Sequence, residues 1–174
     1  MTLFAAFLRG VNVGGVNLKM AEVATALSDA GFTNVRTILA TGNVLLESKS
    51  GLNTPAAVRK KAEAALRERF GYEAWVLAYD IDTVRAISEA FPFEREVDGY
   101  QSYVTFVTDA KVLDELAALP AGSDEKIAPG TGVIYWQVPK GSTLDSTIGK
   151  TMGKPRYKSS TTTRNLRTLA KVLQ

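Results

Sequence analysis

The chain has 174 residues, of which 45% are apolar and 22% charged, a balance typical of one soluble globular domain or two small lobes sharing a core. It contains no cysteine and no histidine, which excludes disulfides, thiolate nucleophiles, Cys/His zinc sites and Ser-His-Asp triads. No apolar run approaches the roughly 20 residues that cross a bilayer, and the first residues lack a signal-peptide pattern. We therefore expect a cytoplasmic protein with no membrane partner.

Positive charge is concentrated near the C-terminus. Residues 146–174 contain seven of the 21 basic residues and no acidic residue, which leaves 14 basic and 18 acidic residues for the rest of the chain. A basic end on a slightly acidic body predicts an anionic partner, either a small molecule or a nucleic acid. The alternative is a solvated basic helix that keeps the protein soluble.

The first 79 residues predict the element order β-α-β-β-α-β. Apolar and β-branched runs predict strands over residues 3–8, 35–40, 44–48 and 74–79. The first helix is expected to start at a cap formed by Asn17 and to end at Gly31. Thr54 and the proline after it predict the start of the second helix, and Gly71 predicts its end.

The second half of the chain predicts a similar order. Asp80 is expected to cap a helix that stops before Pro92, and a charged connector follows over residues 93–100. Further strands are predicted over 101–108, 126–128 and 133–138, and further helices over 109–119, 143–152 and from about Thr162 onward. Two successive β-α-β-β-α units and a C-terminal helix predict an α+β fold of two ferredoxin-like (split βαβ) halves, with domains 1–91 and 92–174.

A segment rich in glycine and asparagine lies between the first strand and the first helix. Glycines permit backbone angles closed to other residues, and a helix N-terminus favours an anion. The segment therefore predicts an anion or phosphate cradle, with the candidate ligand-binding residues Arg9, Asn12, Gly14, Gly15, Asn17 and Lys19. Lys19 is expected in the first helical turn, where the helix dipole disfavours a cation. The alternative is a structural connection in which Asn17 only caps the helix.

The segment does not match the common nucleotide-binding loops. Gly10 and Gly15 have the spacing of a Walker A loop, but Val16 and Asn17 stand where that loop needs Lys and Ser/Thr. The chain also contains no Gly-x-Gly-x-x-Gly. We therefore predict no cofactor. Asp80 and the nearby Asp82 resemble a carboxylate pair for magnesium, but helix capping explains them and no metal is predicted.

Two further segments contribute candidate ligand-binding residues. Thr41 and Asn43 lie in the predicted turn between two strands. Arg164 and Asn165 lie at the predicted start of the last helix, where the threonines of residues 161–163 offer caps. A cation in the first turn of that helix favours a nearby anion, which is either a ligand or a carboxylate from elsewhere in the fold.

Aromatic residues on the predicted strands suggest base stacking on an open sheet face: Trp75, Tyr79, Tyr103, Phe106, Tyr135 and Trp136. Tyr135 and Trp136 are neighbours, however, so they point to opposite faces of their strand and at least one packs in the core. The match to an RNA-recognition motif is poor, and core packing is the favoured interpretation.

Several spaced motifs resemble the bacterial family with domain of unknown function 1697 (DUF1697). They are Leu8-Arg9-Gly10-Val11-Asn12-Val13-Gly14-Gly15, Lys19-Met20, Gly31-Phe32-x-x-Val35-Arg36-Thr37, Thr41-Gly42-Asn43-Val44 and Thr162-Thr163-Arg164-Asn165. One departure is Leu166, where many relatives are expected to have Trp. The resemblance spans nearly the whole chain and implies a duplicated α+β fold in a small cytosolic bacterial protein. It implies no activity.

The sequence leaves three classes of function open. The favoured hypothesis is a binding module for a phosphate-bearing or other anionic ligand, whose signature segments would converge on one surface. The first alternative is an enzyme acting on a phosphorylated or carboxylated metabolite, in which Arg9, Lys19 and Arg164 give electrostatic stabilisation. The second is a structural or protein-interaction module, whose signature polar groups would bond to their own backbone.

Overall fold

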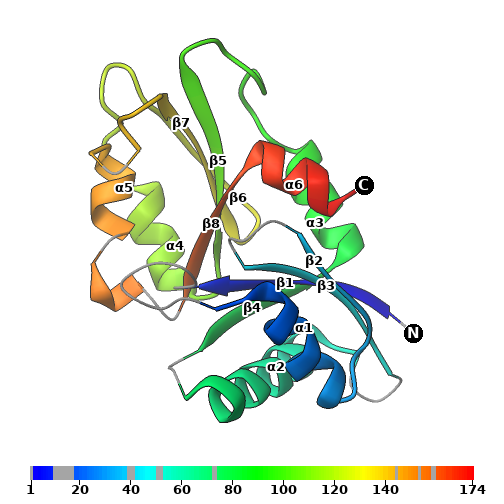
Figure 1. The fold of residues 1–174 in the computed structure, drawn as a ribbon. Helices are drawn as coiled ribbons and strands as arrows, with labels where there is room; N and C mark the ends of the chain where they lie inside the picture. The colour runs from blue at the N-terminus through cyan, green and yellow to red at the C-terminus, as the bar shows by residue number, and fades with distance from the viewer. Residues whose placement is uncertain are drawn as a thin grey trace. The chain divides into compact units, whose positions relative to one another are not determined.

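A computed structural model describes residues 2–9, 18–38, 42–49, 53–71, 74–143, 145–152, 154–157 and 160–174. It divides into two compact units, unit 1 (Met1–Val84 with Val172–Gln174) and unit 2 (Arg85–Lys171). Each unit has a four-stranded antiparallel sheet with helices (Figure 1), so the predicted α+β class is confirmed. The predicted boundary between residues 91 and 92 stays a prediction, and each unit is described by itself. Within the described residues, every helix is too short or too polar to span a membrane.

Unit 1 has the predicted element order. The elements are β1 (Thr2–Arg9), α1 (Met20–Asp29), β2 (Thr33–Ile38), β3 (Asn43–Ser48), α2 (Pro55–Phe70), β4 (Trp75–Asp80) and the start of α3 (Ile81–Glu89). The strand order in the sheet is β2-β3-β1-β4, and every neighbouring pair is antiparallel. Alternate residues of β1, such as Phe4 and Leu8, pack with α1 and α2 on one face of this sheet.

Local capping signals place the helices of unit 1. Thr54 accepts a hydrogen bond from the backbone N–H of Ala57 (3.2 Å), and Gly71 ends α2 in the left-handed conformation at φ 65°. The carboxylate of Asp80 accepts hydrogen bonds from both the backbone N–H (2.9 Å) and the hydroxyl (2.8 Å) of Thr83. These three predicted boundaries are confirmed. Asp80 thus caps α3.

The start of α1 differs from the prediction. The N-cap position is Lys19 rather than Asn17, and the Lys19 side chain makes no capping hydrogen bond. Asn17 lies outside the described residues. The helix therefore begins later than the sequence indicates, and Lys19 has the extended backbone of an N-cap, with φ −78° and ψ 124°.

Unit 2 has the same strand order in its own sheet. It contains the end of α3 and then β5 (Tyr100–Val107), α4 (Ala110–Ala117), β6 (Lys126–Gly130), β7 (Val133–Pro139), α5 (Thr147–Met152), the 3₁₀ turn η1 (Pro155–Tyr157), β8 (Thr161–Asn165) and α6 (Leu166–Val172). The order β6-β7-β5-β8 corresponds strand for strand to β2-β3-β1-β4 of unit 1. Asp109 caps α4 by accepting from the backbone N–H of Lys111 at 2.9 Å.

The largest difference from the sequence prediction is β8. Residues 161–165 form a strand paired with β5, not the start of a helix, and α6 begins only at Leu166. The hydroxyl of Thr163 lies 2.8 Å from that of Thr105 on β5, so the threonines cap no helix. β-branched residues fit a pleated strand, and pairing with β5 satisfies their backbone groups. The predicted helix over 143–152 is likewise shorter, since α5 starts at Thr147.

Aromatic residues fill both faces of the sheet in unit 2. Trp136 stacks on Tyr103 with ring centroids 4.4 Å apart and donates to the hydroxyl of Thr105 at 2.9 Å. Tyr135 points to the other face and donates its hydroxyl to the carbonyl of Ile87 at 2.7 Å. Phe106, Tyr135 and Trp136 are all buried, so the prediction that core packing outweighs base stacking is confirmed for them.

The charged connector after α3 is bonded to unit 2. Arg95 donates to the carbonyl (2.6 Å) and hydroxyl (3.0 Å) oxygens of Ser88 at the end of α3. Gln137 on β7 donates to the carbonyl of Glu94 (2.8 Å) and to the hydroxyl of Ser102 (2.9 Å). These bonds satisfy buried groups on the sheet face, so the connector is part of the packed structure of this unit.

Candidate functional site

The structure describes five of the ten candidate ligand-binding residues. Asn12, Gly14, Gly15, Asn17 and Thr41 lie outside the described residues. Arg9, Lys19 and Asn43 belong to unit 1, whereas Arg164 and Asn165 belong to unit 2.

Arg9 is the last residue of β1, immediately before the glycine-rich segment. It is paired with Trp75 on β4, so these two side chains lie on the same face of the sheet. Its Nε atom is buried, and this burial lowers the pKa of the Arg9 guanidinium. Because a desolvated charge interacts strongly with an opposite charge, this position favours a negative group nearby.

Lys19 lies at the other end of the same segment. It is exposed and occupies the N-cap position of α1, where the helix dipole places partial positive charge. Glu22 in the first turn is an acidic residue of the kind this position normally favours. The connection between β1 and α1 is therefore flanked by a partly buried cation and by an exposed one.

Asn43 begins β3 and is fully buried. It is paired with Phe7 of β1, which places its side chain on the same sheet face as Arg9. Its side-chain amide donates to the carbonyl of Ile38 at 3.0 Å, and the backbone N–H of Leu8 donates to the carbonyl of Gly42 at 2.8 Å. The structure therefore brings Gly42 to the end of β1, and Asn43 joins the start of β3 to the end of β2.

Arg164 has a different place from the one predicted. It lies in β8 rather than in the first turn of a helix, and it is 8% exposed. Its guanidinium donates to the hydroxyl of Thr162 (2.7 Å) and to the carbonyl of Thr163 (2.8 Å). The expected conflict between this cation and a helix dipole is therefore absent at this described residue, which removes that argument for an anion there.

Asn165 is the N-cap of the last helix. Its side-chain oxygen accepts from the backbone N–H of Thr168 at 2.8 Å. The signature pair Arg164 and Asn165 thus forms the junction between β8 and α6. Both residues bond to nearby backbone atoms, which is what a structural role requires.

The basic C-terminal run is divided among contacts within unit 2. Arg156 forms an ion pair with Glu115, whose carboxylate also accepts from the hydroxyl of Tyr157 at 3.0 Å. Arg167 lies 3.6 Å from the carboxylate of Glu96. Together with buried Arg164, these arginines near the C-terminus therefore have partners inside the unit.

Two features of α2 were not predicted from the sequence. Arg67 donates from Nε (3.2 Å) and Nη2 (2.9 Å) to the carbonyl of Ala74, just before β4. Glu63 accepts from the backbone N–H of Val76 at 2.8 Å and pairs with Arg59 at 3.2 Å. On the sequence these residues look like ordinary surface charges of an amphipathic helix, so only the packing of α2 beside β4 identifies them.

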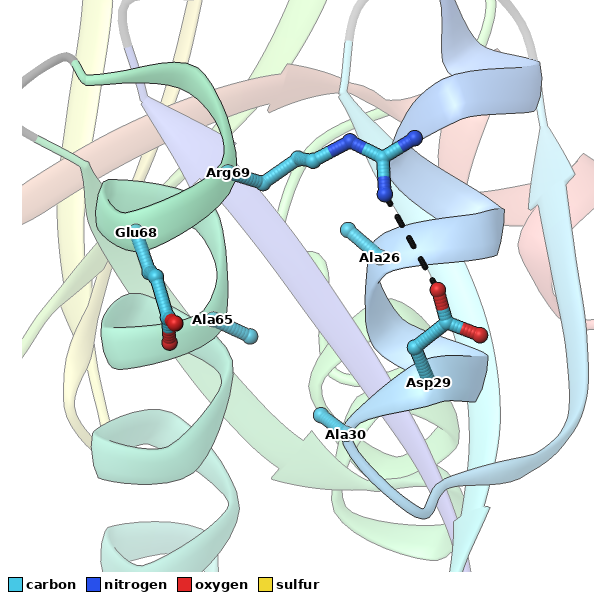
Figure 2. Close-up of a pocket in the computed structure, with 6 residues that line it drawn as sticks. All are labelled: Ala26, Asp29, Ala30, Ala65, Glu68 and Arg69. Carbon is cyan, nitrogen blue, oxygen red and sulfur yellow. Dashed lines mark ion pairs between the residues drawn. The ribbon is translucent and has the colours of Figure 1, made fainter.

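A hollow of about 440 Å³ lies between α1 and α2 (Figure 2). Alanine side chains and three charged residues line it: Ala26, Ala30, Ala65, Asp29, Glu68 and Arg69. An exposed ion pair of 3.8 Å between Arg69 and Asp29 spans the two helices. The lining contains no residue of the predicted site, and small side chains between two helices explain the hollow.

Comparisons with known proteins identify a family and a fold. The model of the family described as "Protein of unknown function (DUF1697)" matches residues 1–135. The sequence matches no curated protein. A solved structure, the conserved bacterial protein SP0830 from Streptococcus pneumoniae, is similar with a TM-score of 0.80 and 24% identity over 99% of this chain and 97% of that chain. This likeness supports the fold.

Proposed function

This chain belongs to the DUF1697 family of proteins of unknown function, and we propose that it is a binding module for a phosphate-bearing or other anionic ligand. The observation that carries this proposal is the pair of cations at the two ends of the glycine-rich segment. Arg9 ends β1 with a partly buried guanidinium, and Lys19 occupies the N-cap of α1. The ligand would bind at the end of β1 in unit 1.

The chemistry of these two positions suits an oxyanion. A guanidinium offers paired N–H donors that match carboxylate or phosphate oxygens, and its partial burial strengthens their attraction. The N-terminal end of α1 adds partial positive charge beside the Lys19 ammonium. Asn43 would act as a positioning residue, because its bond to Ile38 joins the start of β3 to the end of β2 beside β1.

We also propose a finer description of the fold and location. Each unit would be a ferredoxin-like (split βαβ) half, so that the chain is a duplication. The matching strand orders β2-β3-β1-β4 and β6-β7-β5-β8 support this description. We further propose that the protein acts in the bacterial cytoplasm, for which the bacterial origin of the similar structure is the support.

A titration with inorganic phosphate and with a short labelled DNA tests the binding proposal, at two salt concentrations. We expect Arg9→Gln to weaken phosphate binding by about 10- to 100-fold, as for loss of a charged hydrogen bond. Lys19→Ala should weaken it by about two- to fivefold. The matched control is Lys49→Ala, because Lys49 is exposed and follows β3 at the opposite end of the sheet.

The proposal is wrong if phosphate and DNA both fail to bind at millimolar concentration, or if binding ignores salt and both substitutions. Thermal unfolding of each variant separates a lost site from a lost fold. Arg9→Lys keeps the charge and should retain part of the affinity, since only the paired geometry is lost.

A structural role is the second candidate, and the contacts of Asn43, Arg164 and Asn165 favour it. Each donates to or accepts from a backbone group within a few residues. Under this candidate, Asn43→Ala lowers the melting temperature while phosphate affinity, if measurable, stays unchanged. A variant that keeps full stability but loses phosphate binding would contradict it.

A further inference from the structure

We propose that the ligand of this site is a nucleotide, with its phosphate at Arg9 and its base stacked on Trp75. This inference rests on the proposed function and adds the chemical class of the ligand. The observation that supports it is the pairing of Arg9 on β1 with Trp75 on β4. This pairing puts a cation and an indole ring side by side on one sheet face. Side chains so paired have Cβ atoms about 4.5–5.5 Å apart.

The surroundings of Trp75 hold its ring in a fixed position. Trp75 starts β4, an outer strand of its sheet, and it remains partly exposed. The guanidinium carbon of Arg67 lies 5.1 Å from the ring centroid, and this guanidinium is itself bonded twice to the carbonyl of Ala74. A ring that is fixed before binding loses little freedom when a base stacks on it.

The charge around Trp75 also suits a nucleotide. Arg67 and Arg9 are both basic, so the ring lies in a positive environment that attracts an anionic ligand. Stacking of a base on an aromatic side chain contributes about 1–3 kcal/mol, and a phosphate alone would not gain it. A site made of Arg9 and Trp75 would therefore bind a nucleotide more tightly than a sugar phosphate that has no base.

The second tryptophan provides an internal control. Trp136 is 1% exposed, lies in unit 2 and has its indole N–H bonded to Thr105 at 2.9 Å. The protein therefore has two indole N–H signals in an NMR spectrum, one for each unit. Substitution of Trp75 by Phe identifies which signal belongs to which residue.

The test titrates the full chain with three probes: adenosine 5′-monophosphate, ribose 5-phosphate and inorganic phosphate. We expect adenosine 5′-monophosphate to bind about 5- to 100-fold more tightly than ribose 5-phosphate and to shift the Trp75 indole signal while the Trp136 signal stays in place. In Trp75→Leu, this preference should disappear while phosphate binding remains. Arg67→Gln should reduce the preference, because Arg67 no longer holds the Trp75 ring, and should weaken phosphate binding less than Arg9→Gln does.

The outcomes separate the two proposals. Equal affinities for adenosine 5′-monophosphate and ribose 5-phosphate, with phosphate still bound, would overturn the nucleotide proposal and leave the anion site standing. Failure of all three probes to bind would overturn both. If Trp75→Leu is unfolded, Trp75→Phe replaces it, and we then expect a smaller but measurable preference because a phenyl ring keeps part of the stacking surface.

Discussion

The fourth strands of the two units, β4 and β8, occupy the same position in their sheets, but different side chains cover them. Each strand has one neighbour in its sheet and therefore one outer edge. In unit 1, Arg67 and Glu63 of α2 bond to the carbonyl of Ala74 and the N–H of Val76. In unit 2, Arg164 bonds to the carbonyl of Thr163 from within β8 itself.

The length of the preceding helix explains the difference. α2 has 16 residues, so it reaches along the strand and brings two charged side chains to its edge. α5 has only six residues and offers no comparable surface. An uncovered edge strand invites pairing with another chain, so each unit meets the same requirement with the side chains that its local structure provides.

The other outer strands, β2 and β6, also have features that prevent pairing with a further strand. Pro129 lies in β6, and a proline has no N–H to donate to a further strand. In β2, the pairing with β3 shifts register between Thr33 and Arg36, where Asn34 has a positive φ of 49°. Both features interrupt a regular edge.

The largest expected effect concerns the short helix of unit 2. A Cβ on Gly149 would lie 1.9 Å from the carbonyl oxygen of Thr143, so Gly149→Ala must displace α5 relative to Thr143. We expect a loss of more than about 4 kcal/mol in the free energy of unfolding, measured by urea denaturation. The control is Gly141→Ala, where φ is +86° but the space is open and about 1 kcal/mol is expected. Equal losses would show that α5 is not fixed in this way.

Arg164→Gln should be the next most damaging change. It removes a buried cation with bonds to Thr162 and Thr163, and we expect a loss of about 2–4 kcal/mol by denaturation. Arg67→Gln should cost only about 1 kcal/mol, because Arg67 is largely exposed. Arg167→Gln is the control for an exposed ion pair, with less than about 1 kcal/mol expected. A larger loss for Arg67 than for Arg164 would contradict the comparison of the two edges.

Alkaline pH should weaken unit 1 through Tyr79 on β4. Burial raises the pKa of Tyr79 to about 12, although the positive charge of Arg59 acts in the opposite direction. An unfolded tyrosine has a pKa of about 10, so the folded state binds the proton more tightly and stability falls as the pH rises from about 10 to about 12. We expect the unfolding free energy of the wild type to fall by up to about 2–3 kcal/mol relative to Tyr79→Phe over this range. If the unfolding free energies of the wild type and Tyr79→Phe change in parallel with pH, Tyr79 does not cause the loss of stability.

Glu63→Ala should have a smaller effect than Gly149→Ala, Arg164→Gln or the ionisation of Tyr79. The N–H of Val76 would lose its carboxylate acceptor, and we expect a loss of about 1–2 kcal/mol by thermal unfolding. Glu63→Gln keeps an acceptor oxygen and should lose less. If the two variants are equally unstable, the hydrogen bond to β4 does not contribute as described.

Local signals were enough to predict part of the fold. Thr54, Gly71 and Asp80 make capping contacts with groups only three or four residues away. The predicted helix boundaries at these three residues are confirmed. Threonines 161–163 carry the same capping chemistry, but their structure depends on β5, which lies some 58 residues earlier in the chain, as for Thr105 and Thr163. Pairing over that distance overrides a local signal.

The site shows the same limit. The sequence identified Arg9 and Asn43 as separate candidates, and only the pairing of β1 with β3 and β4 places them, with Trp75, on one sheet face. In the sequence, Trp75 is one of six aromatic residues on predicted strands, and nothing there marks it as part of a site. The register that pairs it with Arg9 depends on the packing of three strands that are buried on both faces, so no alternation in a single motif reveals it.

The order of Arg67, Glu63 and β4 along the chain has a consequence for biosynthesis. Both charged residues belong to α2, so they leave the ribosome before the strand whose backbone they bond. Arg164 emerges within the strand whose carbonyl it bonds. In both units, therefore, the side chains that bond to the outer edge strand are synthesised before that strand is complete. These are Arg67 and Glu63 for β4 and Arg164 for β8.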